Sequence, residues 1–326
     1  MIKRRGFLKG LAATIPLGVA AAIVRNKPER PDPRANPEAF RLDLDQYSHV
    51  DPGLLGYREN PPLVDGLKGA RAMSMAPDGT LYLSAGKMVL RLTENHEEVF
   101  AEGEGQVTAV GASGDDCLWM AMGPILTRYD AAGQLKGESV HLGERGYVTA
   151  IAPGDKELFV ADAGQKTIWV FSSDGRLRGC IDGRSAGDTQ SGFVIPSPWF
   201  HVTAGSGELW VTNPGRQRVE RYVDGLLIES WGLPAMSVDG FCGCCNPTHL
   251  ALLPGGGFVT SEKGIPRVKV YNRDGEFSSV VAGADAFDED TTGLAVAAAS
   301  NGRIFVLDPV RGQLRVFTPK AQEGGA

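Results

Sequence analysis

Positive charge is scarce in this sequence outside its first residues. The 326 residues include 33 Lys and Arg against 39 Asp and Glu, which gives a net charge of −6. The first 22 residues hold four of the bases and no acid, so the rest of the chain is more acidic still. An acidic body argues against nucleic acid or an anionic membrane surface as the main partner, because both carry negative charge. No stripe of basic residues with aromatic residues between them offsets this balance.

Short motifs that identify common enzyme classes are also missing. The sequence contains no G-x-S-x-G, no H-E-x-x-H and no phosphate-binding loop. These absences exclude the nucleophile elbow of α/β-hydrolases, the helical zinc motif of many metalloproteases and the phosphate loop of NTPases. The function therefore has to be sought in other residue patterns.

Long hydrophobic runs are absent too. The longest candidate, Leu11 to Val24, has fourteen residues, fewer than the ~20 that a stable membrane-spanning helix needs. It follows Arg4 and Arg5, and adjacent arginines before an apolar run are typical of a twin-arginine export signal. Residues 1–24 are thus predicted to be a cleaved signal or a retained anchor, the only part in contact with a membrane. The protein is then expected in the periplasm or anchored to the outer side of the cytoplasmic membrane.

Short apolar strands and tight glycine turns, in contrast, recur along the chain. Six such strands are spaced 37 to 51 residues apart and begin at Leu81, Leu118, Leu158, Leu209, Phe258 and Ile304. A period of this length, with alternating strands and 43 glycines, is typical of propeller blades. We predict an all-β, six-bladed β-propeller over residues 39–320, preceded by a Pro-rich linker at 25–38 and followed by a disordered tail at 321–326.

The sixth repeat shows only three apolar strands, at residues 294–298, 303–307 and 313–318. The segment from Ala39 to Leu44 alternates apolar and polar residues, as a strand with one buried face does. We predict that this segment supplies the missing outer strand, which closes the ring and removes an exposed sheet edge.

The stretch NPTHLALLPGGGFVTSEKGIPRVKVY, residues 246–271, resembles an NHL repeat. The resemblance covers about residues 67–320 and is weaker in the first two repeats, where the turn between the second and third strands is shorter. Together with the preceding Cys-Gly-Cys-Cys segment, it is similar to a group of exported bacterial NHL propellers without an established activity. The resemblance implies architecture and export, and it implies no particular reaction.

Three of the five cysteines lie in one short segment. Cys242, Cys244 and Cys245 lie within four residues, and His249 follows four residues later. Thiolates and imidazoles are the ligands that select zinc, copper(I) or iron–sulfur centres, so the cluster predicts a metal ion or an iron–sulfur cluster. The spacing departs from the usual C-x-x-C, so it does not identify the metal.

A disulfide is the alternative for these thiols. In an exported protein two of them can pair, or one can pair with Cys180 near the end of the third repeat. The adjacent Cys244 and Cys245 can also form a reducible disulfide, which would indicate redox work. Cys117 precedes an apolar strand and is predicted to be a small buried residue.

Two histidines stand where other repeats have apolar or small residues. When the first strands of the repeats are aligned, His201 and His249 fall in neighbouring columns. The first strand of each blade lines the central channel, so the two side chains can converge between blades 4 and 5 and join the cysteines as ligands. The alternative is a buried histidine satisfied by a backbone carbonyl.

Polar residues recur at the end of the second strand of four repeats. This channel-mouth polar ring can hold calcium, since hard cations prefer oxygen ligands, or it can cap the local turn; its members are Asp162, Asn213, Glu262 and Asp308. Basic residues on the same face can bind a carboxylate or phosphate or pair with surface acids; they are Arg216, Arg218, Lys263, Arg267 and Arg311.

The pattern as a whole predicts an exported propeller with a thiolate site, acting as a binding or electron-transfer module with a redox protein or a small anionic ligand as partner. One alternative is an enzyme at the channel mouth, resembling calcium-dependent six-bladed lactonases or the zinc-dependent NHL propellers that cleave peptidyl-hydroxyglycine. The other is a protein-interaction scaffold with a structural disulfide.

Overall fold

The computed structural model describes residues 45–94, 96–114, 117–184, 192–205 and 207–320. The described residues form one compact unit. The predicted signal, linker and tail lie outside the described residues and stay predictions. In the described part, no helix combines the length and the apolar character that crossing a membrane requires.

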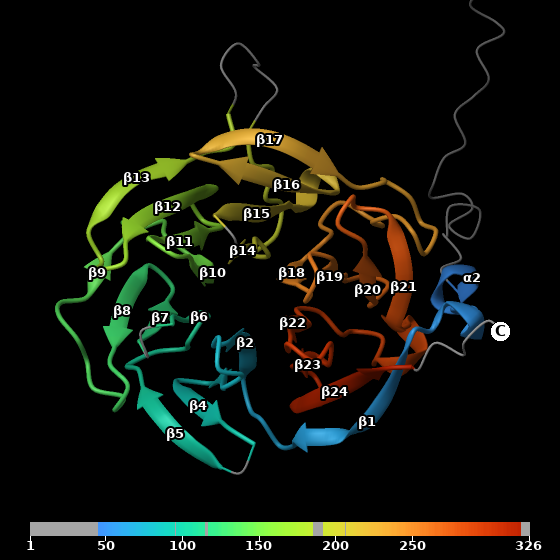
Figure 1. Ribbon diagram of the computed structural model, residues 1–326, viewed down its shortest axis with the longest axis horizontal. Coiled ribbons are helices and arrows are strands. Elements are labelled where there is room, and N and C mark those ends of the chain that lie inside the picture. Colours follow the sequence, from blue (N-terminus) through green and yellow to red (C-terminus); the bar gives the residue numbers. More distant parts are fainter. Residues whose placement is uncertain (1–44, 95, 115–116, 185–191, 206, 321–326) are drawn as a thin grey trace, which may run out of the picture. The chain divides into compact units, whose positions relative to one another are not determined.

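Six four-stranded antiparallel sheets surround a central channel, so the predicted six-bladed β-propeller is confirmed (Figure 1). Blade 1 contains β2 (Ala70–Met75), β3 (Leu81–Ala85), β4 (Met88–Leu92) and β5 (Glu97–Glu102), and blade 2 contains β6 (Ala109–Ala112), β7 (Leu118–Met122), β8 (Ile125–Tyr129) and β9 (Val140–His141). Blade 3 contains β10 (Val148–Pro153), β11 (Glu157–Asp162), β12 (Thr167–Ser172) and β13 (Leu177–Ile181), and blade 4 contains β14 (Val202–Gly205), β15 (Glu208–Asn213), β16 (Arg218–Val223) and β17 (Leu226–Trp231).

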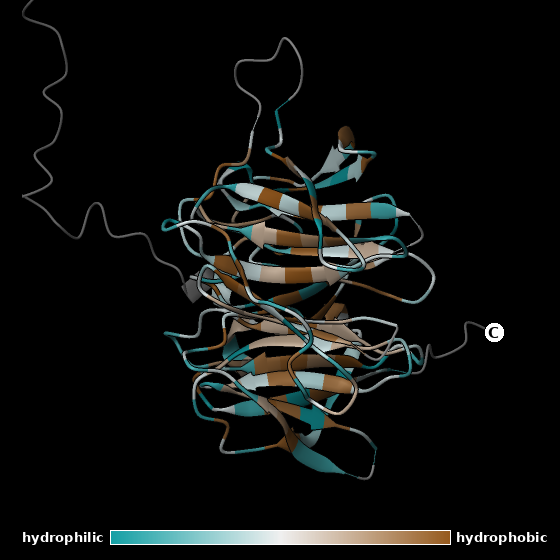
Figure 2. Cartoon of the chain, turned by 90° about the vertical axis from the view of Figure 1, so that its left-hand side faces the viewer, coloured by the Kyte–Doolittle hydropathy of each residue, from teal (hydrophilic) through white to brown (hydrophobic). Residues whose placement is uncertain are grey.

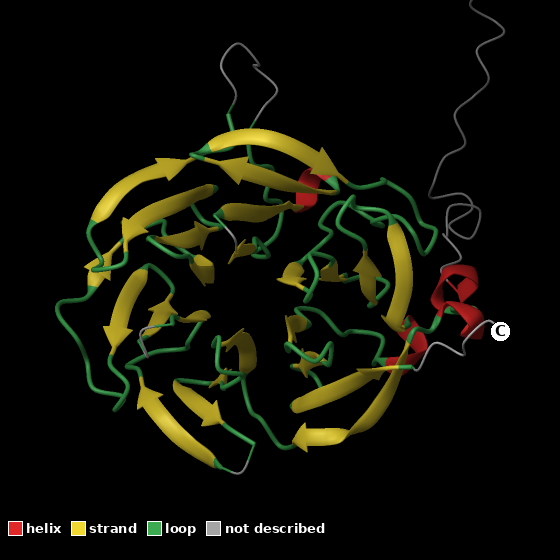
Figure 3. Ribbon diagram, viewed as in Figure 1, coloured by secondary structure: helices red, strands yellow, loops and turns green. Residues whose placement is uncertain are grey.

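Blade 5 contains β18 (His249–Leu252), β19 (Phe258–Ser261), β20 (Val268–Tyr271) and β21 (Phe277–Ala282). Blade 6 joins β22 (Ala295–Ala298), β23 (Ile304–Asp308) and β24 (Gln313–Pro319) to the N-terminal strand β1 (Tyr57–Val64). Helices are few and short (Figure 3): α2 (Asp45–Ser48) and the 3-10 turns η2 (Pro52–Leu54), η3 (Pro214–Arg216) and η4 (Ala284–Ala286).

The ring closes through β1, so the prediction that residues 39–44 supply the outer strand of blade 6 is wrong. Tyr57 pairs with Pro319 and Asn60 with Val316, and the register shifts after Asn60, where two prolines follow. Proline lacks the N–H group that a ladder needs, and an edge strand tolerates this loss. The two prolines make this segment look unlike a strand in the sequence, although an outer edge strand can contain them.

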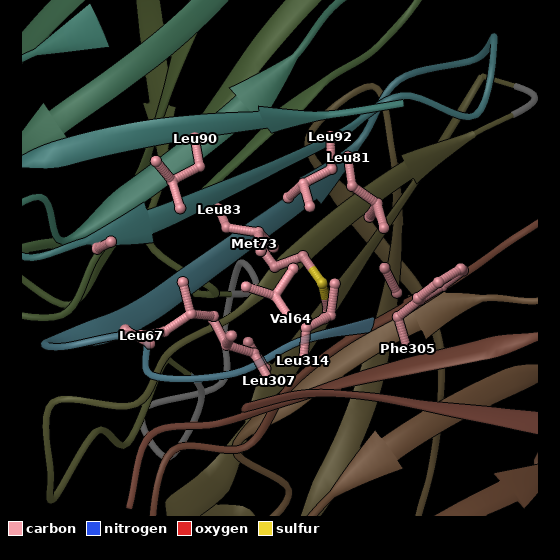
Figure 4. Close-up of a cluster of buried hydrophobic side chains, with 14 of the residues drawn as sticks. Val64, Leu67, Met73, Leu81, Leu83, Leu90, Leu92, Phe305, Leu307 and Leu314 are labelled. Atoms are coloured by element: carbon pink, nitrogen blue, oxygen red, sulfur yellow. The ribbon is translucent and has the colours of Figure 1, made fainter. Parts of the chain in front are cut away.

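Hydrophobic side chains fill the spaces between neighbouring blades. Along the strands, hydrophobic and hydrophilic residues alternate (Figure 2), because successive side chains point to opposite faces of a sheet. Where blade 6 meets blade 1, Val64, Leu83 and Leu307 pack together in one of these clusters (Figure 4). Each blade is thus held by its two neighbours, and the ring as a whole forms the core.

Two connections between blades are long. One joins β13 to β14 and the other joins β17 to β18. Each connection runs to the innermost strand of the next blade. A residue at the end of the second strand of that same blade holds the connection in place. Asn213 accepts a hydrogen bond from the backbone N–H of Val194 in the first connection, and Glu262 accepts one from Cys242 in the second.

Candidate functional site

The innermost strands place one residue from each blade at the same level of the channel. In every blade this residue immediately precedes the one that pairs with the third residue of the second apolar strand, counted from Leu81, Leu118, Leu158, Leu209, Phe258 or Ile304. All six line a channel cavity of about 210 Å³. We call them the channel ring: Ala72, Ala109, Ala150, His201, His249 and Ala295. Four blades thus contribute alanine and two neighbouring blades contribute histidine.

The sequence alignment had placed the two histidines one column apart, and this offset is wrong. The residue after Ala150, Ile151, pairs with Val160, and the residue after His201, Val202, pairs with Val211, each nine positions later. The residue after His249, Leu250, pairs with Thr260, ten positions later. The turn between the first two strands is therefore one residue shorter in blades 3 and 4, which shifts the alignment there by one position.

His201 and His249 converge at the junction of blades 4 and 5, as the hypothesis required. Their ring centroids lie 5.1 Å apart with an interplanar angle of 55°. His249 opens β18 and His201 immediately precedes β14, and these two strands lie side by side at the channel (Figure 1). Trp199 packs on the other side of His249, with ring centroids 5.5 Å apart. The pair therefore forms part of the channel wall.

Hydroxyl groups determine the tautomer of His249. Its Nδ1 lies 3.3 Å from the Thr248 Oγ1 and 3.4 Å from the Ser261 Oγ. The Ser261 hydroxyl donates to the Leu294 carbonyl, and the Thr248 hydroxyl donates to oxygens of Ser261. Since both hydroxyl protons are used, Nδ1 of His249 must carry the proton and donate it. The lone pair of this imidazole is then on Nε2.

Both imidazoles are neutral at pH 7. Burial lowers the pKa of His201 to about 4. Burial also lowers the pKa of His249 well below its usual value, and the neighbouring His201 and Arg71 lower it further. The Nδ1 atom of His201 is buried and has no hydrogen-bond partner among the described residues. The pair thus offers unprotonated nitrogen atoms at the channel wall.

Arg71 supplies a positive charge at the channel mouth that the sequence reading missed. Its guanidinium lies over the rings of Tyr147 and Trp199, 5.8 Å from each centroid. No hydrogen bond or ion pair joins this side chain to another residue of the described part. One shallow recess beside Arg71 is lined by Trp199 and Thr292, and a second by Glu104 and Tyr147. The sequence does contain a signal for this residue, because Arg71 is the only Lys, Arg, Asp or Glu in the six innermost strands.

The segment of residues 242–245, which we call the cysteine loop, brings two of its three sulfurs together. The sulfurs of Cys244 and Cys245 lie 3.1 Å apart, with Cys244 exposed and Cys245 buried. The Cys242 sulfur is buried and lies 3.7 Å from the side-chain nitrogen of Asn246. His249 faces His201 and Trp199. In the described part of the chain, no three His, Cys, Asp or Glu side chains group so that they would hold a metal ion, and the metal site stays a prediction.

The thiols of this loop differ in acidity. Burial raises the pKa of Cys242, and the charge of Glu262 adds to this effect. Burial also opposes ionisation of Cys245, but contacts with Cys244 and Ser197 and the charge of Lys263 outweigh it and lower its pKa. The contact with Cys245 raises the pKa of Cys244. Cys245 is therefore the sulfur of the pair that carries negative charge more readily.

A buried ionic cluster supports the cysteine loop. Glu262 pairs with Arg267 at 2.7 Å and with Lys269 at 3.2 Å, and all three side chains are buried. Arg267 donates to two backbone carbonyls of the chain that precedes the loop, and Lys269 donates to the carbonyl of Gly240. Burial lowers the pKa of Lys269 to about 8, although Glu262 favours its charged form. The cluster thus fixes the path of the chain leading into the cysteines.

The members of the channel-mouth polar ring are buried within their own blades, and none lines the channel cavity. Asp162 accepts hydrogen bonds from the backbone of Tyr147 and Gln165, and Asp308 accepts them from the backbone of Val310 and Arg311. With the contacts of Asn213 and Glu262 described above, this arrangement matches the turn-capping alternative. Each of the four residues thus makes its contacts within its own blade or with the connection that leads to that blade.

The predicted anion-binding residues have partners of their own. Arg218 pairs with Glu220 at 2.6 Å, and Arg311 pairs with Asp288 at 2.9 Å. Arg216 donates to the carbonyl of Gly192. Arg267 belongs to the buried cluster, and Lys263 acts on Cys245. These cations are therefore engaged in polar or ionic contacts, whereas the guanidinium of Arg71 at the channel mouth contacts only aromatic rings among the described residues.

The two remaining cysteines lie on other blades. Cys180 is exposed on β13, opposite Trp169 in the strand register, and its thiol is free. Cys117 is buried, as predicted, and its sulfur accepts a hydrogen bond from Arg128 at 3.3 Å. The structure therefore shows all five cysteines as free thiols.

Comparison with known proteins identifies the fold. No protein-family model matches the chain, and no curated protein matches it significantly. The WD40 β-propeller domain of Doa1 is similar in structure, with a TM-score of 0.57 and 14% identity over 83% of this chain and 99% of that domain. A streptogramin B lyase has a TM-score of 0.55 and 10% identity over 81% of this chain and 97% of its own.

Virginiamycin B lyase from Staphylococcus aureus, solved with quinupristin in a form inactivated by a histidine-to-alanine substitution, has a TM-score of 0.55. It is 14% identical to this chain and is matched over 81% of this chain and 99% of its own. At such identities the likeness concerns the fold alone. The chain has the β-propeller fold shared by a WD40 domain and by lyases.

Proposed function

We propose that the channel mouth binds a small anionic ligand and that His249 acts on it as a general base, in a lyase or hydrolase reaction. The observation that carries this proposal is the replacement of alanine by two adjacent, neutral histidines in the channel ring. Four blades pack well with alanine at this level, so packing does not require histidine. Burying an imidazole nitrogen without a partner costs free energy, which a ligand-binding role would justify.

Arg71 is the group expected to bind the ligand. A guanidinium binds carboxylate or phosphate in a bidentate manner, and this one is not neutralised by an acid of the described residues. The flanking rings of Tyr147 and Trp199 hold its planar group in position. An anion bound here would offset the charge that lowers the pKa of His249, so ligand binding would make this imidazole a stronger base.

The size of the cavity limits the ligand. Pockets for drug-sized molecules have volumes of about 300–1,000 Å³, and the channel cavity has about 210 Å³. Arg71 lines two recesses of about 320 and 480 Å³ rather than this cavity, so only the part of the ligand that enters the cavity beside His249 has to be small. The histidine-dependent lyase among the structural neighbours supports a reaction of this type on a propeller by analogy only.

Calorimetric titration of the full-length protein with benzoate, acetate and inorganic phosphate tests the binding step. We expect at least one anion to bind the wild type, and Arg71→Gln to weaken its affinity about tenfold or more, because a charge-assisted hydrogen bond is lost. Arg58→Gln, which removes an exposed arginine on β1, serves as the matched control. Equal affinity of the wild type and the Arg71 variant would contradict the assignment.

Hydrolysis of mono-4-nitrophenyl succinate, an ester that carries a free carboxylate for Arg71, tests the chemical step. A positioned general base contributes about 10²–10⁴-fold to a rate. We expect His249→Gln to lower kcat within that range while the affinity for the anion is kept. Turnover by the wild type that survives unchanged in this variant would rule out His249 as the base.

A further inference from the structure

The cysteine loop is held at both ends by the same turn of blade 5. Before the pair, the backbone N–H of Cys242 donates to Glu262. After it, Asn246 donates to the carbonyl of Lys263 at 2.9 Å and accepts from the backbone N–H of Lys263 at 2.9 Å. From blade 4, Gln217 donates to the carbonyl of Gly243. These hydrogen bonds therefore fix the backbone of the segment that carries Cys244 and Cys245.

The sulfurs of Cys244 and Cys245 have different surroundings. Cys244 is exposed, whereas Cys245 is only 7% exposed, and their sulfurs lie 3.1 Å apart. Lys263 and Ser197 act on the sulfur of Cys245. The hydroxyl of Ser197 is buried and makes no hydrogen bond with the described residues. Solvent therefore reaches the outer sulfur, whereas the inner sulfur is enclosed by protein.

We propose that Cys244 and Cys245 form a redox-active pair that exchanges two electrons with thiols and disulfides, with Cys244 as the sulfur that a partner attacks. The partner class is a thiol, either a small one such as glutathione or a cysteine of another protein. This role is independent of the reaction proposed for the channel mouth. It uses the asymmetry of the pair, in which one sulfur is accessible to solvent and the other is buried.

The exchange begins from the oxidised pair. A partner thiolate attacks the sulfur of Cys244, the Cys244–Cys245 bond breaks, and Cys245 leaves as a thiolate beside Lys263 and Ser197. A stabilised thiolate is a good leaving group. A second partner thiolate then attacks the partner's sulfur in the mixed disulfide and releases Cys244. Two thiols are oxidised to one disulfide, the pair is reduced to the dithiol, and the protons pass through solvent.

Equilibration of the full-length protein with mixtures of reduced and oxidised glutathione, in the absence of oxygen, tests the proposal. Free thiols are then alkylated, and peptide masses locate the modified residues. We expect Cys244 and Cys245 to lose alkylation together and to become linked to each other. Cys117, Cys180 and Cys242 should form no internal link. Cys180→Ser removes an exposed cysteine on another blade and should leave this behaviour unchanged.

Single variants separate the two sulfurs. Cys245→Ser should accumulate a mixed disulfide between glutathione and Cys244, and Cys244→Ser should not accumulate one on Cys245. Lys263→Met should slow reduction of the oxidised pair by glutathione about tenfold, because the leaving thiolate loses its counter-charge. Thermal melting verifies that each variant is folded.

Three results would overturn the proposal. The first is independent titration of Cys244 and Cys245. The second is a link from either residue to Cys242 or Cys180. The third is a stoichiometric bound metal ion that shields both thiols from alkylation in the reduced protein. Each of these outcomes assigns the cysteines to a different role.

Discussion

Glu262 is the residue on which the position of the cysteine loop depends most directly. Its carboxylate accepts the N–H of Cys242 and neutralises both Arg267 and Lys269, none of which is accessible to solvent. The two cations in turn hold backbone carbonyls of the loop that precedes Cys242. Removal of this single acid would therefore leave two buried positive charges without a counter-charge.

We expect Glu262→Ala to lower the free energy of unfolding by about 3–5 kcal/mol, the usual cost of removing one partner from a buried ion pair. Urea denaturation followed by tryptophan fluorescence measures the change. The control is Glu229→Ala, because Glu229 pairs with Arg221 while its own side chain is 50% exposed. Loss of an exposed pair costs about 1 kcal/mol or less. Similar values for both variants would show that the buried cluster does not support the loop.

At the scale of elements, β1 determines whether the ring is closed. It is the only strand of blade 6 that comes from the N-terminal part of the chain, and it covers the edge of β24. Glu59 of β1 binds the buried Arg315 of β24 with two hydrogen bonds, of 2.7 and 2.8 Å. An uncovered edge of this kind pairs readily with another chain.

Deletion of residues 1–64 removes β1 and should make the protein aggregate or unfold. Size-exclusion chromatography and thermal melting measure this result. Deletion of residues 1–44 keeps every described strand, so we expect that variant to remain monodisperse with an unchanged melting temperature relative to the full-length chain. A folded, monodisperse protein without β1 would show that closure through this strand is dispensable.

At the scale of the whole molecule, the ring places equivalent residues of six blades around one channel. A change in one repeat therefore alters one sector of the channel wall and leaves the other sectors as they were. His201 and His249 occupy adjacent sectors, so the channel is polar on one side and lined by alanine at the same level on the other. This asymmetry also couples the stability of the ring to pH.

The free energy of unfolding should fall as the pH is lowered from about 6.5 towards 4. The unfolded chain protonates its histidines near pH 6.5, whereas the folded protein keeps the pKa of His201 down to about 4 and that of His249 well below normal. Between these values the unfolded state binds more protons, so acidification favours unfolding. Urea denaturation at pH 7.5 and pH 5 measures the difference. The double variant His201→Ala, His249→Ala should show a smaller one, and an equal pH dependence would contradict the buried-histidine assignment.

The sequence by itself determined the number of blades and, to within one residue, the start of the second strand in each blade. These features follow from local chemistry, since the alternation of apolar residues sets the buried face of each strand and glycine turns set its length. The same locality explains why the sequence left open a meeting of His201 and His249, because neighbouring repeats must place their first strands side by side.

Only the tertiary structure decided which strand closes the ring, which residues share the channel wall and which charge remains unneutralised beside it. A one-residue difference in a turn moved His201 into register with His249, and packing against β24 made a strand of a proline-containing segment. Contacts between distant residues, such as Arg71 with Trp199 and Ser197 with Cys245, depend on how six repeats close into a circle. No pattern along the chain records that closure, because it is a property of the assembled ring.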